Sequence, residues 1–345
     1  MSKRLFVVVN PSHYLNAIEY VYQQGGGDDH IAIMTRHTKG IEGINQLGTD
    51  GMWSELYRLE WEKPSDYKSD REFFTRSQAF LEGTFNKCQP DEIIVGNLVD
   101  GNLYPFILKV KNKVSAITVL DDGTPTLNVA DKRGQGKFYN AYHFRSLRIL
   151  AKNILYQGIL PPAYRPPGKI TFFSMFDFPV RGGDKLVHNN YTWVQSKVKQ
   201  HPQTDEFLFI GSHIVDRKLV SEENYLWSLK KVMEDVSGSG LHFKYVHHRS
   251  ESKHMRERIS EICETTEFNM PLELMFLDKP RPAIFAGHFS SAMFTLARIF
   301  PEIEMRSYLF AEHMILGSEY ESKNYILRVQ KALETDTKVK HKHLA

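Results

Sequence analysis

Two adjacent carboxylates are the side chains that the sequence best places for chemistry. Asp121 and Asp122 follow the apolar run 114–120, "VSAITVL", and precede Gly123. That run is typical of a buried strand, and ligands bind at the carboxyl ends of strands in α/β proteins. Two adjacent carboxylates repel each other if both are ionised, so the pair needs a reason to stand at such a position. Taken alone, the stretch favours an Asp-Asp-Gly turn, because Asp and Gly are common turn residues.

A cationic segment in the second half could receive a phosphate. His247, His248 and Arg249 follow the predicted strand "FKYV". A histidine has an unperturbed pKa near neutrality, so it could protonate a departing phosphate. The alternatives are a solvated turn and a metal-binding pair. Neighbouring residues of a strand point to opposite faces, which disfavours a shared zinc ion, and we expect no metal site.

Two further stretches carry polar groups beside apolar runs. Ser290 and Ser291 follow Gly287, a glycine expected to permit a tight turn, and stand where a helix should begin. Free N–H groups at a helix start, with two hydroxyls, suit a phosphate, although one serine could simply cap the helix. Glu273, in the apolar run "NMPLELMFLDKP", needs a partner or a ligand. Ribose hydroxyls would provide one, and the alternative is a surface glutamate on a short helix.

Missing motifs and composition exclude several classes of protein. The segment "NPSHYLNA" after the first predicted strand has no glycine, and the sequence has no Walker A, H-E-x-x-H or G-x-S-x-G motif. The two cysteines, Cys88 and Cys263, form no C-x-x-C pair and suit a reducing compartment. A net charge of +3 over 345 residues does not indicate a nucleic-acid binder.

The elements that must position these residues alternate between strand and helix. Apolar strands alternating with amphipathic helices predict a mostly parallel, doubly wound α/β sheet. Residues 130–145 are glycine-rich and basic, and we expect a mobile loop there. A solvated loop is the favoured interpretation, and the alternative is that Lys132, Arg133 and Lys137 contact an anionic acceptor. The predicted strands are 4–9, 28–35, 91–97, 115–120, 169–176, 205–215, 240–249 and 281–287, and the predicted helices are 13–24, 70–88, 101–112, 221–237, 256–264 and 290–300.

A proline-rich segment is the predicted domain boundary. Residues 157–169 hold four of the 15 prolines, which stiffen a chain and remove backbone donors. We therefore expect a Rossmann-like domain at 1–156, a linker at 157–169 and a second Rossmann-like domain at 170–345. Two such domains imply a cleft between them.

Neither end of the chain predicts a membrane span. The first apolar run is too short for a signal peptide or a transmembrane helix, so we expect a soluble cytoplasmic protein. The basic segment 337–345, "TKVKHKHLA", is the candidate for peripheral contact with the inner face of the cytoplasmic membrane, although a solvated, frayed terminus is the favoured interpretation.

Together these stretches resemble the bacterial sialyltransferases of the two-Rossmann-domain (GT-B) type. The matching stretches, in order, are "LDDGT" at 120–124, "YVHHRSES" at 245–252 and "FSSAMF" at 289–294. The opening "FVVVNPSHYLNAIEY" resembles the N-termini of lipooligosaccharide sialyltransferases and polysialyltransferases. The family usually has a His-Pro pair, whereas the only His-Pro here is His201-Pro202, in a predicted loop.

The resemblance implies a role for each matching residue. An aspartate of the pair, with Asp122 favoured over Asp121, is the general base on the acceptor hydroxyl. A histidine protonates or hydrogen-bonds the departing CMP phosphate; alignment through Glu251 selects His248, and alignment through the arginine selects His247. The remaining site residues are Ser290 and Ser291 for the phosphate, Glu273 for the ribose, Gly287, Arg249 and Gly211 on the donor side, and Asn10 and His13 on the acceptor side.

The implied activity is that of an inverting, metal-independent glycosyltransferase without a cofactor. It would move sialic acid, or a related nonulosonic acid, from a CMP-sugar donor to a hydroxyl of a bacterial surface glycan such as lipooligosaccharide or capsular polysaccharide. The alternatives are a GT-B transferase or epimerase that uses a UDP- or GDP-sugar, and a non-catalytic protein of glycan assembly.

Overall fold

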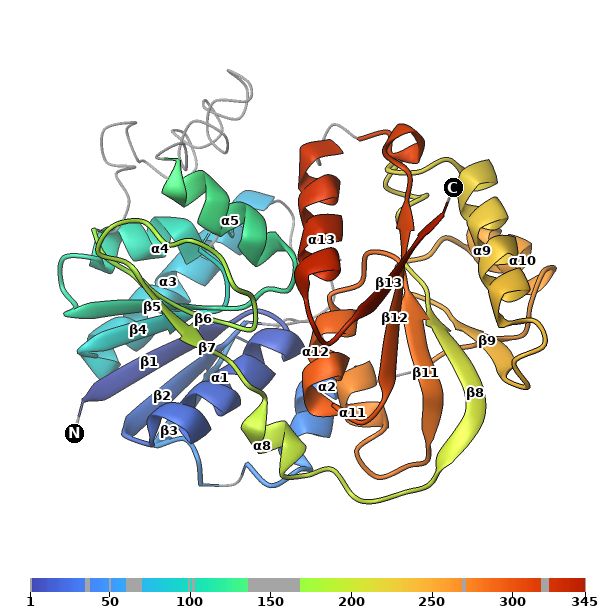
Figure 1. Ribbon diagram of the computed structural model, residues 1–345. Helices are drawn as coiled ribbons and strands as arrows, with labels where there is room; N and C mark the ends of the chain where they lie inside the picture. Colours follow the sequence, from blue (N-terminus) through green and yellow to red (C-terminus); the bar gives the residue numbers. More distant parts are fainter. Residues whose placement is uncertain are drawn as a thin grey trace. The chain divides into compact units, whose positions relative to one another are not determined.

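The computed structural model describes residues 2–34, 38–49, 51–59, 70–98, 100, 103–135, 168–268, 271–317 and 323–344. Within it the chain divides into two compact units, Met1–Trp193 and Val194–Ala345 (Figure 1). Helix α8 (Thr192–Gln195) spans the division.

Unit 1 is built on a parallel sheet with the strand order β3-β2-β1-β4-β5-β6-β7. Five of the six residues of β1 are buried, as expected for a parallel strand with helices on both faces. The strands are β1 (Lys3–Val8), β2 (Asp28–Ile33), β3 (Glu55–Arg58), β4 (Glu92–Val95), β5 (Ala116–Leu120), β6 (Thr171–Ser174) and β7 (Lys185–His188), and the helices are α1 (Pro11–Gln24), α2 (Thr38–Asn45), α3 (Asp70–Cys88), α4 (Leu103–Val110) and α5 (Pro125–Gly134).

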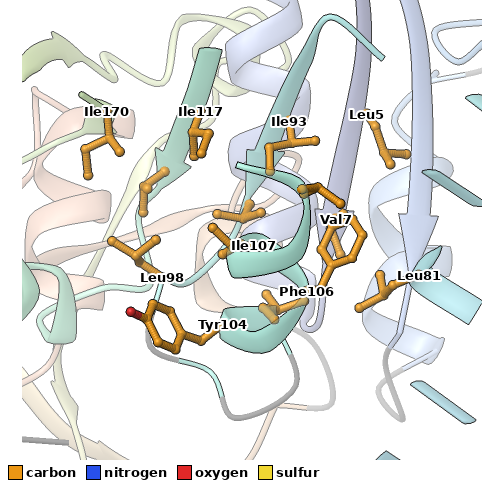
Figure 2. Packing of buried hydrophobic residues seen from close by; sticks show 14 of the residues in the cluster. Leu5, Val7, Leu81, Ile93, Leu98, Tyr104, Phe106, Ile107, Ile117 and Ile170 are labelled. Atoms are coloured by element: carbon orange, nitrogen blue, oxygen red, sulfur yellow. The ribbon is translucent and has the colours of Figure 1, made fainter. Parts of the chain in front are cut away.

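Alternate residues of β1 pack on opposite faces of this sheet. Leu5 and Val7 belong to a core cluster that also holds Phe106 and Ile107 of α4 (Figure 2). Phe6 instead makes an edge-to-face contact with Tyr20 of α1, with 5.9 Å between the ring centroids. Burial of each such side chain contributes about 1.5–3 kcal/mol, so the apolar alternation fixes the strand between its helices.

The predicted domain boundary is wrong. The strand predicted at 169–176, which we expected to open the second domain, is β6, and it pairs with β5 in the first sheet with Thr118 opposite Thr171. Strand β7 then pairs with β6, and unit 1 continues to Trp193. The proline-rich segment therefore lies within unit 1 in the sequence and does not separate the two sheets. Residues 157–167 of the predicted linker lie outside the described residues.

The loop predicted at 130–145 is also wrong where the structure describes it. Residues 130–134 are the end of α5, and Arg133 is buried. Its Nε and Nη2 donate to the carboxylate of Asp184 at 2.7 and 2.8 Å, and Ile170 N donates to the same carboxylate at 3.0 Å. The basic residue therefore holds the segment before β7 against α5 and is not available to an anionic acceptor. Lys137 lies outside the described residues.

Unit 2 is built on a second parallel sheet with the strand order β10-β9-β8-β11-β12-β13. Helix α9 begins as predicted, because Ser221 Oγ accepts from Asn224 N at 3.2 Å, and its apolar face packs on the sheet. The strands are β8 (Gln203–Ile210), β9 (His242–Val246), β10 (Thr265–Thr266), β11 (Arg281–Gly287), β12 (Glu304–Phe310) and β13 (Lys340–Leu344), and the helices are α9 (Glu222–Val236), α10 (Lys253–Ser260), α11 (Leu272–Met275), α12 (Ala292–Ile299), the 3-10 helix η3 (Glu312–Met314) and α13 (Lys323–Thr335).

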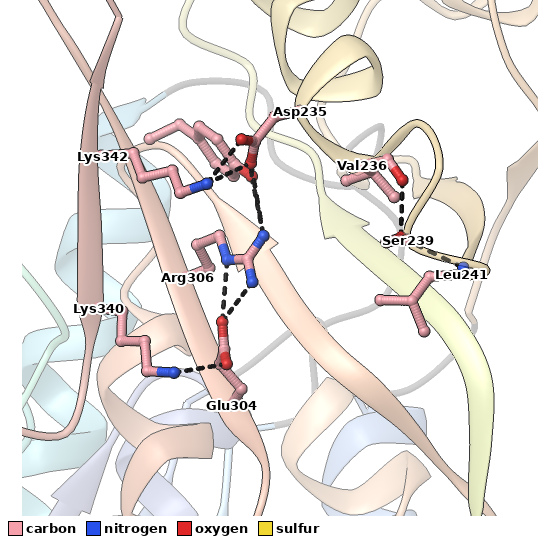
Figure 3. Close-up of polar contacts among 9 residues, drawn as sticks. Asp235, Val236, Ser239, Leu241, Glu304, Arg306, Lys340 and Lys342 are labelled. Carbon is pink, nitrogen blue, oxygen red and sulfur yellow. Dashed lines mark hydrogen bonds and ion pairs between the residues drawn. The ribbon is translucent and has the colours of Figure 1, made fainter.

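The basic C-terminal segment is the edge strand β13, so the prediction of a frayed terminus is wrong. Its backbone pairs with β12, and its lysines meet carboxylates (Figure 3). Lys340 Nζ lies 2.7 Å from Glu304 Oε2, and Lys342 Nζ lies 2.6 Å from Asp235 Oδ1. These ion pairs offset much of the positive charge that suggested a membrane contact. Among the described residues, no helix has the length and apolar character needed to cross a membrane.

Candidate functional site

Each sheet has a point at which the direction of its connections reverses. In the first sheet β1 leads to β2 and β3 on one side, and β4 leads to β5, β6 and β7 on the other. Ligands of open α/β sheets bind beyond the carboxyl ends of the strands at such a point. Asn10 and His13 follow β1, Asn97 follows β4 and Asp122 follows β5, so the strand order gathers these four residues at one edge.

The Asp122 carboxylate is the acceptor on which these side chains converge. His13 Nε2 lies 2.7 Å from Oδ1, Asn10 Nδ2 lies 3.3 Å from the same oxygen, and Asn97 Nδ2 donates to Oδ2. Thr126 Oγ1 accepts from the Asp122 backbone N–H at 2.9 Å. The Asp122 side chain is 24% exposed whereas that of His13 is 1% exposed, so a substrate can reach the carboxylate but not the histidine.

Local backbone geometry places His13 against the Asp122 carboxylate. Asn10 caps α1 by accepting from His13 N at 2.8 Å. A Cβ at Gly96 would lie 2.0 Å from His13 Nδ1, so only glycine fits at this position after β4. A carboxylate accepts only, and therefore the His13 proton is on Nε2. His13 Nδ1 is buried and has no hydrogen-bond partner within the described residues.

Asp121 has a different set of partners and a structural position. Its side chain is buried, Ser174 Oγ donates to Oδ1 at 2.6 Å, and Met175 N donates to Oδ2. Asn16 Nδ2 donates to its carbonyl at 3.0 Å. The first aspartate of the pair therefore ties β5 to the end of β6 and to α1, while the second presents its carboxylate at the edge of the sheet.

The second sheet reverses between β8 and β11. Strand β8 leads to β9 and β10, and β11 leads to β12 and β13. The segments 211–213, 247–249 and 288–291 follow β8, β9 and β11 and so share one edge. The cationic and hydroxyl residues predicted for a phosphate are thus on the same sheet edge.

His247 is held by a buried polar chain. Its Nδ1 lies 2.9 Å from Glu251 Oε2, the other carboxylate oxygen accepts from Tyr245, and the hydroxyls of Tyr245 and Tyr225 are 2.7 Å apart. Burial raises the pKa of Glu251, and the hydrogen bonds from Tyr245 and His247 act in the opposite direction. Gly211 adjoins this chain, because a Cβ there would lie 2.4 Å from the Tyr245 hydroxyl. The structure therefore places Gly211 where it makes room for Tyr245.

His248 stacks on a histidine that the sequence analysis missed. The rings of His213 and His248 are 4.4 Å apart between centroids with an interplanar angle of 17°. Burial, followed by the charges of His213, Arg249, Arg256 and Arg217, lowers the pKa of His248 to about 4. Burial also lowers the pKa of His213. The sequence prediction placed His213 inside the strand "DEFLFIGSHIV", whereas β8 ends at Ile210 and leaves His213 in the loop that follows.

The serine pair lies at the start of α12, as predicted. Ser290 Oγ accepts from Ala292 N at 3.2 Å, and Ser291 is the N-cap residue without a side-chain capping bond among the described residues. Glu273 Oε1 accepts from Thr295 Oγ1 at 2.7 Å, which ties α11 to α12. Gly287 is the last residue of β11, as predicted, and a Cβ there would lie 3.1 Å from the Ile210 carbonyl oxygen. The chain bends at residues 288 and 289, directly after it.

A buried histidine after β11 makes the stability of unit 2 depend on pH. His288 Nδ1 donates to the Tyr308 carbonyl at 2.8 Å, and burial lowers its pKa to about 4. In the unfolded chain His288 has its ordinary pKa of about 6.5. The contribution of neutral His288 to the free energy of unfolding is therefore fully present above pH 6.5 and is lost as the pH falls towards 4. We expect a loss of about 3 kcal/mol across this window from this group. Urea denaturation at several pH values measures this effect. Between pH 6.5 and pH 4 the free energy of unfolding should fall less steeply with pH in His288→Asn than in the wild type, whereas His242→Gln, a change at an exposed histidine, should behave as wild type.

Among the described residues, no group of three or more His, Cys, Asp or Glu side chains is arranged to hold a metal ion.

Comparisons with known proteins place the fold. No protein-family model and no curated protein sequence matches the chain. A solved structure of Arabidopsis thaliana UGT89C1 complexed with UDP is similar over 99% of this chain and 86% of its own, with 12% identity and a TM-score of 0.53. An α/β-galactoside α-2,3-sialyltransferase from Photobacterium phosphoreum is similar over 98% and 97%, with 13% identity and a TM-score of 0.47. UDP-GlcNAc 2-epimerase from Neisseria meningitidis bound to UDP-GlcNAc is similar over 96% and 91%, with 12% identity and a TM-score of 0.49.

The two parallel sheets and the similarity to the plant structure define the class of fold. The chain has two Rossmann-like units and the GT-B glycosyltransferase fold, as the sequence predicted.

Proposed function

We propose that the protein is an inverting glycosyltransferase that moves sialic acid, or a related nonulosonic acid, from a CMP-sugar to a hydroxyl of a surface glycan. One observation carries the chemistry: the half-buried Asp122 carboxylate is oriented by His13, Asn10 and Asn97 at the switch point of the first sheet. The choice of CMP-sugar rests on the order of "LDDGT", "YVHHRSES" and "FSSAMF" in the sequence.

The proposed base is Asp122. It takes the proton of the acceptor hydroxyl while that oxygen forms a bond to the anomeric carbon of the sugar, and a single displacement inverts the configuration. His13 is a positioning residue, since its Nε2–H and the Asn10 amide fix Oδ1 of Asp122. Asp121 positions the loop through its bonds to Ser174 and Met175.

The proposed donor site is the edge of the second sheet. As the bond between the anomeric carbon and the phosphate oxygen breaks, its electron pair goes to that oxygen. The histidine segment 247–249 and the start of α12 with Ser290 and Ser291 supply donors and positive charge for it. Glu273, placed beside α12 by Thr295, is the proposed ligand of the ribose hydroxyls. A leaving group that is already an acidic phosphate diester needs no metal in this mechanism.

Nucleotide binding tests the donor. We expect CMP to raise the melting temperature, by mass action on the native state, and magnesium to leave the shift unchanged. UDP, GDP and NAD, each with and without magnesium, are the comparison. Glu273→Gln should weaken the CMP shift, whereas Glu302→Gln, a change in a carboxylate that pairs with Arg281, should not. A shift with UDP or GDP but not CMP would replace the CMP-sugar donor, and no shift with any nucleotide would favour a non-catalytic role in glycan assembly.

A further inference from the structure

The stacking of His213 on His248 has no role in the proposed reaction. The two rings lie 4.4 Å apart, one after β8 and the other after β9, at the edge where the nucleotide phosphate is proposed to bind. Two like charges at this separation repel strongly, so the pair can accept one proton more readily than two.

Hydrogen bonding decides which ring of the pair can accept that proton. Ser250 N donates to His248 Nδ1 at 3.1 Å, so this nitrogen presents its lone pair to the backbone and the proton of His248 is on Nε2. A second proton on His248 would break this bond. Neither ring nitrogen of His213 makes a hydrogen bond within the described part of the chain, so His213 can be protonated without such a loss.

The charges around the pair are mostly positive. On the loop after β8, Arg217 opposes protonation of His213 and Asp216 favours it. From the loop after β9, Arg249 opposes protonation of both rings, and it is exposed and forms no ion pair among the described residues. From α10, Arg256 opposes protonation of His248.

The carboxylates on the loops that follow β8, β9 and β10 already have partners. Asp216 Oδ2 accepts from Ser252 N at 3.0 Å, Glu251 holds His247, and Glu267 forms an ion pair with Arg256. An anion that binds beside the pair therefore adds its negative charge to that of Asp216.

We propose that binding of a nucleotide phosphate at this edge places one proton from solvent on His213, while His248 donates its Nε2–H to the same phosphate. The inference rests on the proposed function for the location of the phosphate. The proton is taken up on binding and returns to solvent on release. Because the complex holds one proton more than the free protein, the affinity falls as the pH rises, by up to about tenfold per pH unit.

Isothermal titration calorimetry with CMP, in Tris and HEPES at about pH 7.5, measures this proton. A difference in observed enthalpy between buffers of unequal ionisation enthalpy gives the number of protons taken up. We expect about 0.5–1 proton per nucleotide for the wild type and less than about 0.2 for His213→Phe, which keeps the stacking without a titrating nitrogen. His242→Gln, at the other end of β9, should retain the wild-type value. The phosphomonoester of CMP has a pKa of about 6 and could also take up a proton on binding. Uptake by the phosphate should persist in His213→Phe, whereas uptake by His213 should be lost.

The same titrations with UDP and inorganic pyrophosphate distinguish this inference from the proposed donor. Binding of either with proton uptake that is lost in His213→Phe would support the role of His213 even if CMP does not bind. Binding of any of the three anions without uptake, or with equal uptake in His213→Phe, would overturn it. Failure of all three to bind would overturn the phosphate site together with the proton uptake.

Discussion

Asp122→Asn should lower kcat/KM for glycosyl transfer by about 10²–10⁴-fold, the range for loss of a positioned general base. The amide keeps the volume of the carboxylate and can still accept from His13, so we expect the fold to persist. It cannot take the proton of the acceptor hydroxyl. The rate should be measured with a CMP-sugar donor and a glycan acceptor, alongside the binding of CMP, which should remain within a few fold of wild type.

Two further variants test whether this loss comes from the base itself. Asp91→Asn changes a carboxylate just before the start of β4, whereas Asn97 of the candidate site follows the other end of that strand. This variant should leave the rate unchanged. Asp121→Asn should reduce the thermal stability, because Ser174 Oγ and Met175 N both donate to the buried carboxylate. A wild-type rate in a folded Asp122→Asn protein would refute the proposed mechanism.

Arg133→Ala should lower the free energy of unfolding of unit 1 by about 3–5 kcal/mol. The Arg133 guanidinium and the Asp184 carboxylate are both buried, and the substitution leaves a buried carboxylate without its cation. Asp184 also accepts from Ile170 N just before β6, so the change should loosen the segment that joins β6 and β7 to α5. Urea denaturation followed by circular dichroism measures the effect.

An exposed ion pair and a double replacement provide the controls for Arg133. Lys231→Ala removes an exposed pair with Glu234 and should cost less than about 0.5 kcal/mol. Arg133→Met combined with Asp184→Leu removes both buried charges and should be more stable than Arg133→Ala alone. A loss below about 1 kcal/mol in Arg133→Ala would show that the buried pair does not hold these strands.

The order of apolar runs and helices was enough to predict the class of fold. Parallel strands buried on both faces are near-continuous apolar runs, and "RLFVVV" and "DEIIV" have this character. The start of α9 at Ser221 and the start of α12 after the serine pair follow from capping chemistry, which is local. These features depend on neighbours in the sequence, and so the sequence predicts them.

The domain boundary needed the tertiary structure. Nothing local distinguishes the strand "TFFS" as the last central strand of one sheet from the first strand of another. The partners that decide it are long-range: the ladder between β5 and β6, and the bonds from Ser174 and Met175 to Asp121. The basic residues Arg133, Lys340 and Lys342 were likewise misjudged, because their carboxylate partners lie 51, 36 and 107 residues away.

The candidate site divides in the same way. The sequence by itself determined that Asp121 and Asp122 follow a strand, that a histidine-arginine segment follows another, and that two serines precede a helix. Each of these features is read from one short stretch. Only the tertiary structure decided that Asp122 is accessible while Asp121 is buried, that His13, Asn10 and Asn97 orient it, and that His213 stacks on His248. The physical reason is that strand order, which the sequence does not state, brings the ends of β1, β4 and β5, and of β8 and β9, to a common edge.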